Sequence, residues 1–337
     1  MSSTYSDIAG EFGLEGRVQI VSAKHPVHDF GQARAEIWND LRAALPLIDS
    51  KYFYDDRGSH LFEDITRLPE YYQTRTEEAL LEKIADEIVG LTDPRELVEL
   101  GSGAGRKIHL LLDAMQRGGT LDRCVLLDVN AAFLSTSARR LATDYRGLEV
   151  RGVVGDFFHD LGVVGTGHER LFLFLAGTIG NIHPDRLPGF LAQVRRVLGR
   201  NDTFLVGLDL VTDTRILEDA YNDSAGVTAE FNRNILRVLN RRFGTDFETD
   251  AFEHVAFYDT DREWIEMRLR ALRPTSVSLD RSNEPIRFDA GDEIRAAISC
   301  TYTRLSFVEA LFGTGLELWR WWTDPDELCA RALVRPS

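Results

Sequence analysis

The residues best suited to chemistry are three closely spaced glycines that follow a short apolar segment. Gly101, Gly103 and Gly105 come directly after residues 96–100, and a helical pattern of apolar residues begins near Ile108. Glycines let a backbone approach a ligand closely, and the N-terminus of a helix offers unpaired N–H groups. The sequence therefore predicts a strand, a glycine turn and a helix that cradle a nucleotide-sized ligand. The plainer alternative is a turn that only connects the strand to the helix.

The spacing of these glycines discriminates between ligands. A dinucleotide-binding turn has the pattern G-x-G-x-x-G, in which the third glycine packs the helix against the strand. Here the pattern is G-x-G-x-G, and Arg106 stands where the third glycine would fall. The G-K-[ST] motif of a phosphate-binding loop is also missing from this segment. Glu99, two residues before Gly101, suits a ligand with a cationic, amino-acid-like tail. The pattern thus favours S-adenosylmethionine over a nicotinamide dinucleotide.

Acidic residues end the next two apolar segments of the chain. Asp128 follows residues 125–127, and Asp156 with Phe157 follows residues 150–154. An acid at the end of the second strand of such a fold holds the two hydroxyls of a ribose. An acid and an aromatic after the third strand can bond the adenine amino group and cover its ring. These positions extend the predicted S-adenosylmethionine site beyond the glycine turn.

The elements that must hold these residues form a regular series. Residues 171–175 are wholly apolar, as expected for a strand buried on both faces of a sheet, and residues 204–210 form a further strand. Repeated strand-helix units predict an α/β fold with an open, doubly wound sheet. Ligands bind at the carboxyl ends of its strands, at the topological switch point.

The rest of the chain has a different texture and predicts a second domain. Residues 28–50 read as an amphipathic helix, residues 212–247 as helical, and residues 252–302 as alternating strands. We expect a second, mostly antiparallel domain that is discontinuous in sequence. The predicted boundaries are a mobile N-terminus at 1–20, a substrate-binding domain at 21–74 and 212–301, and a cofactor-binding domain at 75–211 and 302–337.

Composition restricts the class of protein. The chain has 337 residues, 44% of them hydrophobic, and a formal charge of −15, which disfavours a nucleic-acid or anionic-membrane partner. No apolar run reaches the roughly 18 residues of a membrane span, and the first residues lack a signal pattern. The three cysteines are widely spaced and the histidines show no metal-ligand spacing. We expect a cytoplasmic, monomeric enzyme with reduced thiols and no metal.

Ten segments resemble a known family, the L-histidine Nα-methyltransferases of the ergothioneine pathway, from about residue 45 onwards. They are FYDDRGSHLFEDITRLPEYYQTRTE, ELGSGAGRK, LLDVN, GDF, GTIGN, DAYNDSAGVTAEFNRN, AFEHVAFYD, IEMRLRA, SCTY and WWTDP. The resemblance implies S-adenosylmethionine-dependent methylation of the α-amino group of a free amino acid, up to the trimethylammonium betaine. It also implies a Rossmann-like class I methyltransferase sheet with a family-specific α+β substrate domain.

The resemblance assigns roles to individual residues. The residues that contact the cofactor in this family correspond here to Gly101, Lys107, Asp128, Asp156 and Phe157. Lys107 would reach the carboxylate of the cofactor.

The residues that contact the amino-acid substrate in this family correspond to four further residues of this chain. Asn181 and Tyr221 would bind the substrate carboxylate, Tyr71 would lie against the side chain, and Tyr54 would orient the amine. Tyr54 and Asn181 are thus the residues predicted to act in catalysis. A tyrosine at pKa near 10 is a poor base at neutral pH, so orientation is the role expected for Tyr54.

One position departs from the pattern of the histidine-specific members. In those, a glutamate and a serine two residues apart hold the imidazole; here the serine is Ser299, but Ala297 replaces the glutamate. Met267 would line the same pocket with an apolar side chain. An enlarged, apolar pocket favours a bulkier aromatic substrate, tryptophan first, with histidine and its betaine hercynine as the alternative. Glu293 or Asp292 could replace the missing carboxylate if the strand is bulged.

Two more distant alternatives remain. The first is methylation of a protein or nucleic acid, which the charge of −15 does not favour. The second is a non-catalytic module that binds the cofactor, against which the intact segments ELGSGAG, LLDVN and GDF argue.

Overall fold

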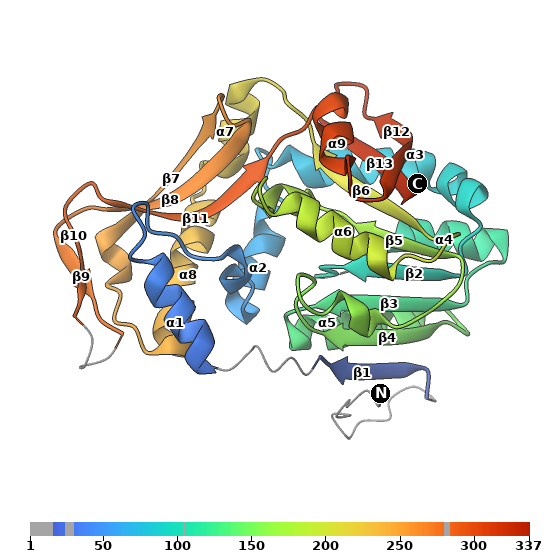
Figure 1. Cartoon of the computed structure of the whole chain (residues 1–337), viewed down its shortest axis with the longest axis horizontal. Coiled ribbons are helices and arrows are strands. Elements are labelled where there is room, and N and C mark those ends of the chain that lie inside the picture. Colours follow the sequence, from blue (N-terminus) through green and yellow to red (C-terminus); the bar gives the residue numbers. More distant parts are fainter. Residues whose placement is uncertain (1–15, 24–29, 104, 280–283) are drawn as a thin grey trace. The chain divides into compact units, whose positions relative to one another are not determined.

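The computed structural model describes residues 16–23, 30–103, 105–279 and 284–337, and the chain divides into two units (Figure 1). The first unit comprises Met1–His25, Gln73–Val211 and Thr301–Ser337, and the second comprises Pro26–Tyr72 and Thr212–Cys300. Both units are therefore discontinuous in sequence, and each contains its own sheet.

The first unit is built on an eight-stranded sheet in the order β1-β4-β3-β2-β5-β6-β13-β12. The first six strands in this order are parallel to one another. β13 pairs antiparallel with β6, and β12 pairs antiparallel with β13, so β13 alone runs against the other strands of this sheet. The strands are β1 (Val18–Ser22), β2 (Glu96–Leu100), β3 (Arg123–Asp128), β4 (Glu149–Val154), β5 (Arg170–Phe174), β6 (Thr203–Asp209), β12 (Leu316–Thr323) and β13 (Cys329–Pro336). The order reverses between β2 and β5, which makes this the topological switch point.

Helices cover both faces of this sheet, as its buried strands require. The helices of the first unit are α3 (Tyr72–Thr92), α4 (Ile108–Gly118), α5 (Ala131–Asp144), α6 (Leu187–Val197) and α9 (Arg304–Leu311), with short 3₁₀ turns η2 (Leu161–Val164) and η3 (Thr178–Asn181). Side chains alternate between the two faces of a strand. Leu171 and Leu173 accordingly join the core formed with α3, α4 and α5, whereas Phe174 packs at 5.1 Å from Phe190 of α6.

The second unit combines helices with a three-stranded antiparallel sheet in the order β11-β8-β7. Its strands are β7 (Phe252–Asp259), β8 (Trp264–Ala271) and β11 (Glu293–Cys300), and a separate hairpin pairs β9 (Thr275–Val277) with β10 (Ile286–Phe288). Its helices are α1 (Phe30–Asp40), α2 (Asp56–Ile65), α7 (Thr214–Tyr221) and α8 (Val227–Phe243), with 3₁₀ turns η1 (Ser50–Phe53) and η4 (Thr249–Ala251). This unit is α+β.

Three expectations for the N-terminal region need correction. We predicted that residues 1–20 are mobile; residues 1–15 lie outside the described residues, but Val18–Ser22 forms β1, which pairs with β4 over its whole length. We assigned residue 21 onwards to the substrate domain, whereas the described residues 21–23 belong to the first unit. The helix expected over 28–50 is shorter and ends at Asp40, before a 3₁₀ turn begins at Ser50.

The described residues add three simple findings. Cys124, Cys300 and Cys329 are buried free thiols. Among the described residues, no cluster of histidine, cysteine and acidic side chains is suited to hold a metal ion. None of the helices within the described ranges combines the length and apolar character needed to cross a bilayer.

Candidate active site

The glycine turn lies at the carboxyl end of β2, beside the switch point of the sheet. Gly101 and Gly103 adopt φ angles of 73° and 48°, in the left-handed region that favours glycine. Ser102 N–H and Gly101 N–H both donate to the carbonyl of Leu127, which ties the turn to the end of β3. A Cβ added at Gly103 would meet no atom of the described residues within 4 Å. The turn thus leaves open space where a ligand can approach its backbone.

Asp128 ends β3 and is held by the same turn. Its Oδ2 accepts a 2.8 Å hydrogen bond from Gly103 N–H, and its Oδ1 accepts one of 2.8 Å from Asn130 N–H. Burial raises the pKa of Asp128, and these backbone donors oppose that rise. The carboxylate is therefore fixed against the glycine turn with lone pairs left for further donors, as the predicted bonds to ribose hydroxyls require.

Asp156 and Phe157 follow β4 in the positions predicted for adenine contacts. Asp156 is buried, and its Oδ1 accepts a 2.8 Å bond from Phe158 N–H. The ring of Phe157 packs edge-on against Phe174, with 5.2 Å between centroids. One edge of the Phe157 ring would lie 3.9 Å from a Cβ at Gly101, so the ring borders the glycine turn.

Glu99 supplies a direct indication that this cradle accepts a ligand. It lies on β2 two residues before Gly101 and is 5% exposed, yet its Oε2 has no hydrogen-bond partner among the described residues. Burial, with a smaller contribution from the charge of Asp128, raises the pKa of Glu99 to about 8. A buried carboxyl oxygen without a donor is costly unless a ligand satisfies it. This edge of the sheet combines an unpartnered acid with glycines that leave room for a ligand. That combination fits the cationic tail and the adenosyl group of S-adenosylmethionine.

Lys107 precedes α4 and forms an ion pair with Glu77 of α3. Glu77 is buried, and it also pairs with Arg331 at 2.8 Å and accepts a 2.8 Å bond from Ala176 N–H. The carboxylate of Glu77 thus joins the end of the glycine turn to the loop after β5. The predicted contact between Lys107 and a cofactor carboxylate would add to this ion pair.

Asn181 ends the 3₁₀ turn η3, which follows β5 at the same edge of the sheet. Ala176 and Gly177 before this turn both have a φ of 62°, and Thr178 Oγ1 donates a 2.7 Å bond to the carbonyl of Leu175. Asn181 is half-buried, and its place at the carboxyl edge suits the predicted contact with a substrate.

In the second unit, the predicted substrate residues form one chain of contacts. The Tyr54 ring lies 5.9 Å from Phe62, Phe62 lies 6.3 Å from Tyr71, and Tyr71 lies 6.3 Å from Tyr221, all edge-on. Tyr221 then donates a 2.9 Å hydrogen bond to Ser299. The end of α7 is held in place because the ring of His254 on β7 bonds the Tyr221 carbonyl at 2.9 Å.

Met267, Ala297 and Ser299 share one face of the small sheet. Ala297 lies opposite Met267, and Ser299 lies opposite Ile265, so the pairing directs all of them to the same side. A bulge between Arg295 and Ala297 sets this register. The face is the one that meets Tyr221.

The alternative in which Glu293 or Asp292 replaces the missing carboxylate is wrong. Glu293 lies opposite Arg270 on the other face of the sheet and pairs with Arg268 and Arg270 at 2.6 and 2.7 Å. These partners lower the pKa of Glu293. Asp292 accepts a bond from Asp289 N–H within its own turn.

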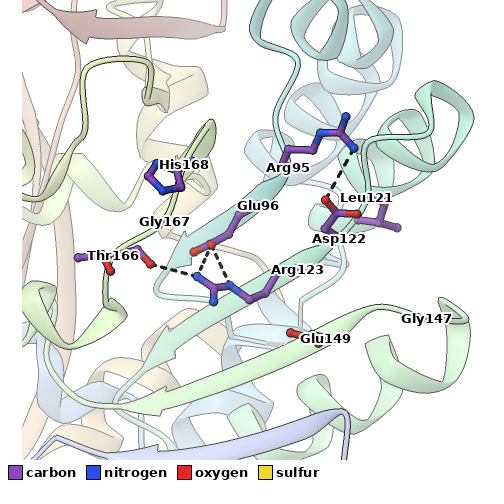
Figure 2. A pocket seen from close by; sticks show the side chains of 10 residues that line it. All are labelled: Arg95, Glu96, Leu121, Asp122, Arg123, Gly147, Glu149, Thr166, Gly167 and His168. Atoms are coloured by element: carbon purple, nitrogen blue, oxygen red, sulfur yellow. Dashed lines mark hydrogen bonds and ion pairs between the residues drawn. The ribbon is translucent and has the colours of Figure 1, made fainter.

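A pocket of about 650 Å³ lies at the opposite, amino-terminal edge of the large sheet (Figure 2). Arg123 pairs with Glu96 on the neighbouring strand, and Arg95 lies 3.7 Å from Asp122, so both arginines of the lining are paired. None of the predicted site residues lines it. We assign the chemistry to the carboxyl edge.

Asp209 is a buried carboxyl at that edge that sequence analysis did not single out. It ends β6 and is 9% exposed, and burial raises its pKa to about 7. The rule that identified Asp128 and Asp156, an acid at the end of an apolar strand, also applies to residues 204–210.

A parallel sheet in this order, with a glycine turn after the strand at the switch point and acids ending the next two strands, defines a Rossmann-like methyltransferase of the class that uses S-adenosylmethionine. Residues 33–336 match the family model of the histidine-specific, S-adenosylmethionine-dependent methyltransferases, and the chain belongs to this family. The protein is therefore an S-adenosylmethionine-dependent N-methyltransferase that acts on an amino acid.

Two mycobacterial proteins are similar over most of this chain. One is a histidine N-alpha-methyltransferase of Mycobacterium tuberculosis, 40% identical over 91% of this chain and 96% of its own length. The other is a histidine N-alpha-methyltransferase of Mycolicibacterium smegmatis, 43% identical over 87% of this chain and 91% of its own. A more distant relative, N-methyltransferase fsqC of Aspergillus fumigatus, is 26% identical over 89% of this chain.

Proposed function

We propose that this enzyme methylates the α-amino group of free L-histidine up to the trimethylammonium betaine, hercynine. The observation that carries this proposal is the likeness to two histidine N-alpha-methyltransferases at 40% and 43% identity across nearly their whole lengths. The predicted substrate residues Tyr71, Tyr221 and Ser299, which contact one another, support a site for an amino acid with a flat side chain.

The chemistry asks for positioning more than for reactive side chains. S-adenosylmethionine, when bound, supplies a methyl group on a positively charged sulfur. The unprotonated amine must meet this methyl group in line, and holding the two in near-attack geometry can supply roughly 7–11 kcal/mol of the barrier. Before each transfer the amine must lose a proton.

In our proposal, one group of residues binds the cofactor. Asp128, Asp156 and Phe157 bind the adenosyl group over the backbone of Gly101 and Gly103. Glu99 and Lys107 bind the charged tail of the cofactor, Glu99 through its unpartnered carboxyl oxygen and Lys107 through its charge.

A second group of residues binds the amino-acid substrate. Asn181 and Tyr221 bind the carboxylate, Tyr71 packs on the side chain, and Tyr54 orients the amine. An unchanged kcat/KM for Tyr54→Phe would show that the Tyr54 hydroxyl does not orient the amine.

Tryptophan is a second candidate substrate, favoured by one specific observation. The face that carries Met267, Ala297 and Ser299 has no carboxylate among its paired positions on β8 and β11. A carboxylate bonded to an imidazole N–H contributes roughly 1.5–3 kcal/mol, and without it an apolar, roomier pocket suits an indole.

A panel of the twenty free amino acids with labelled S-adenosylmethionine tests both candidates. Turnover of histidine alone supports the first proposal and overturns the argument from Ala297. Preference for tryptophan supports the second. Turnover of no free amino acid would contradict both, and a histidine product that stops below three methyl groups would contradict the betaine.

A further inference from the structure

Asp209 combines deep burial with the absence of a protein partner. Its side chain is 9% exposed, and neither carboxyl oxygen has a hydrogen bond or ion pair to any of the described residues. A carboxyl group kept for stability normally holds a donor, as Asp202 does by bonding both the backbone and the guanidinium of Arg170. Asp209 is therefore built for a group that the protein itself does not supply.

The position of Asp209 places that group at the working edge of the sheet. β6 runs parallel to β5 and β2, so Asp209 ends at the same edge as the glycine turn and the loop that carries Asn181. Ligands of such sheets lie at this edge, next to the switch point. Cofactor residues occupy the ends of β2, β3 and β4, which leaves the ends of β5 and β6 for the reacting substrate.

A close contact fixes the direction of the carboxyl. A Cβ at Gly177 would lie 3.1 Å from Asp209 Oδ2 and 3.5 Å from Oδ1, so both oxygens face the turn that leads to Asn181. Gly177 also has a φ of 62°, which strains any other residue. The turn that presents Asn181 thus packs directly against the Asp209 carboxyl.

We propose that Asp209 is a catalytic residue that accepts the proton of the substrate α-ammonium group before methyl transfer. This inference rests on the proposed function. The N–H bond breaks, its electron pair stays on nitrogen as the lone pair, and the proton forms an O–H bond on Asp209. The lone pair then forms the N–C bond, the electrons of the S–C bond remain on sulfur, and Asp209 releases its proton to solvent before the next transfer.

The surroundings of Asp209 suit this exchange. Cys329 lies opposite it on β13, and burial, the charge of Asp324 and that of Asp209 all raise the pKa of this thiol, which stays neutral. Arg331 lies two residues further along β13, opposite Gly207, and is neutralised by Glu77. The backbone N–H of Tyr302, a buried residue, bonds the Asp209 carbonyl. Burial raises the pKa of Asp209 to about 7, which is close to the optimum for a group that takes and returns a proton.

The test compares the pH dependence of kcat/KM in the wild type and in Asp209→Asn, with the amino acid that the wild type methylates. We expect the variant to lose roughly 10²–10⁴-fold at neutral pH. The loss should shrink once the pH exceeds the pKa of the ammonium group, because the amine is then already unprotonated. Titration of the substrate side chain affects both enzymes equally, so it cancels in the ratio of their kcat/KM values. A loss that is the same at every pH, or no loss, overturns the proposal.

Controls separate catalysis from folding and from the proposed function. Asp86→Asn makes the same change at an exposed ion pair of α3 and should leave the profile unchanged. Adenosylhomocysteine should bind wild type and Asp209→Asn equally. If Asp209→Asn does not fold, Asp209→Ala with added formate replaces it, and failure of formate to raise its activity overturns the proposal. Inactivity of the wild type towards all amino acids contradicts the proposed function instead.

Discussion

The hydroxyl of Tyr221, at the end of α7, donates a 2.9 Å hydrogen bond to the hydroxyl of Ser299 on β11. The resemblance gave these residues separate tasks, Tyr221 for the substrate carboxylate and Ser299 for the side chain. Because they bond each other, a change in one must alter the position of the other. In the proposed site, this bond would couple recognition of the two ends of the amino acid.

This coupling predicts non-additive effects. Tyr221→Phe and Ser299→Ala each remove one partner of the bond, and each should raise KM for the amino acid about 2- to 12-fold. The double variant should raise KM by less than the product of the single effects. Steady-state kinetics of the four proteins measures this difference. Ser276→Ala, an exposed serine of β9, is the matched control.

The face that carries Ala297 predicts a change in specificity. Ala297→Glu places a carboxylate opposite Met267 on the side that meets Tyr221. A bond from this carboxylate to an imidazole should raise kcat/KM for histidine relative to tryptophan roughly 10- to 150-fold. Competition between the two amino acids in one assay measures the ratio. Ala290→Glu adds the same charge at an exposed turn and should leave the ratio unchanged. A fall in the ratio for Ala297→Glu would contradict the assignment of this face.

The places of the proposed cofactor residues at the strand ends could be predicted from sequence because the rule is local. Glycines after one strand and acids at the ends of the next two, Asp128 and Asp156, occupy fixed places in a parallel sheet. Asp209 satisfies the same rule, but the run FLVGLDL was read only as a strand. The same rule, an acid at the end of an apolar strand, could have identified Asp209, but it was used only for the strands before the switch point.

Other features depend on packing that no short pattern encodes. Glu77 acquires its role from Lys107, Ala176 and Arg331, residues that lie far apart in sequence. The side of the strand on which Glu293 lies depends on a bulge before Ala297, and one residue of slip reverses every side chain. The strand at residues 18–22 forms because β4 offers it an edge, although its own sequence is short.

The buried network around Glu77 predicts a stability defect. Glu77→Gln keeps an acceptor for Ala176 N–H but removes the charge that neutralises Arg331, which is 0% exposed. An uncompensated buried charge costs about 3–5 kcal/mol, and each kcal/mol lowers Tm by roughly 2–4 °C in a domain of this size. We expect Tm to fall by about 10 °C in thermal unfolding. Glu82→Gln, an exposed residue of the same helix, should leave Tm unchanged.

The ionisation of Glu99 predicts how stability depends on pH without cofactor. The pKa of Glu99 is raised to about 8 in the folded protein, against about 4.3 in an unfolded chain. Between these values the folded protein retains a proton that the unfolded chain has lost, so the free energy of unfolding falls as the pH rises. Below about pH 4 both states are protonated and the penalty disappears.

Glu99→Gln cannot ionise and should escape this penalty. Its Tm should match that of the wild type near pH 4 and exceed it by several degrees at pH 8, as measured by calorimetry without S-adenosylmethionine. Glu149→Gln, an exposed glutamate of β4, should follow the wild type at both pH values. A difference in Tm between Glu99→Gln and the wild type that is equal at both pH values would show that ionisation of Glu99 is not the cause. In the wild type, the same acid should make the protein gain most from a cationic ligand at the alkaline end of this range, because Glu99 is then already ionised and no proton has to be displaced.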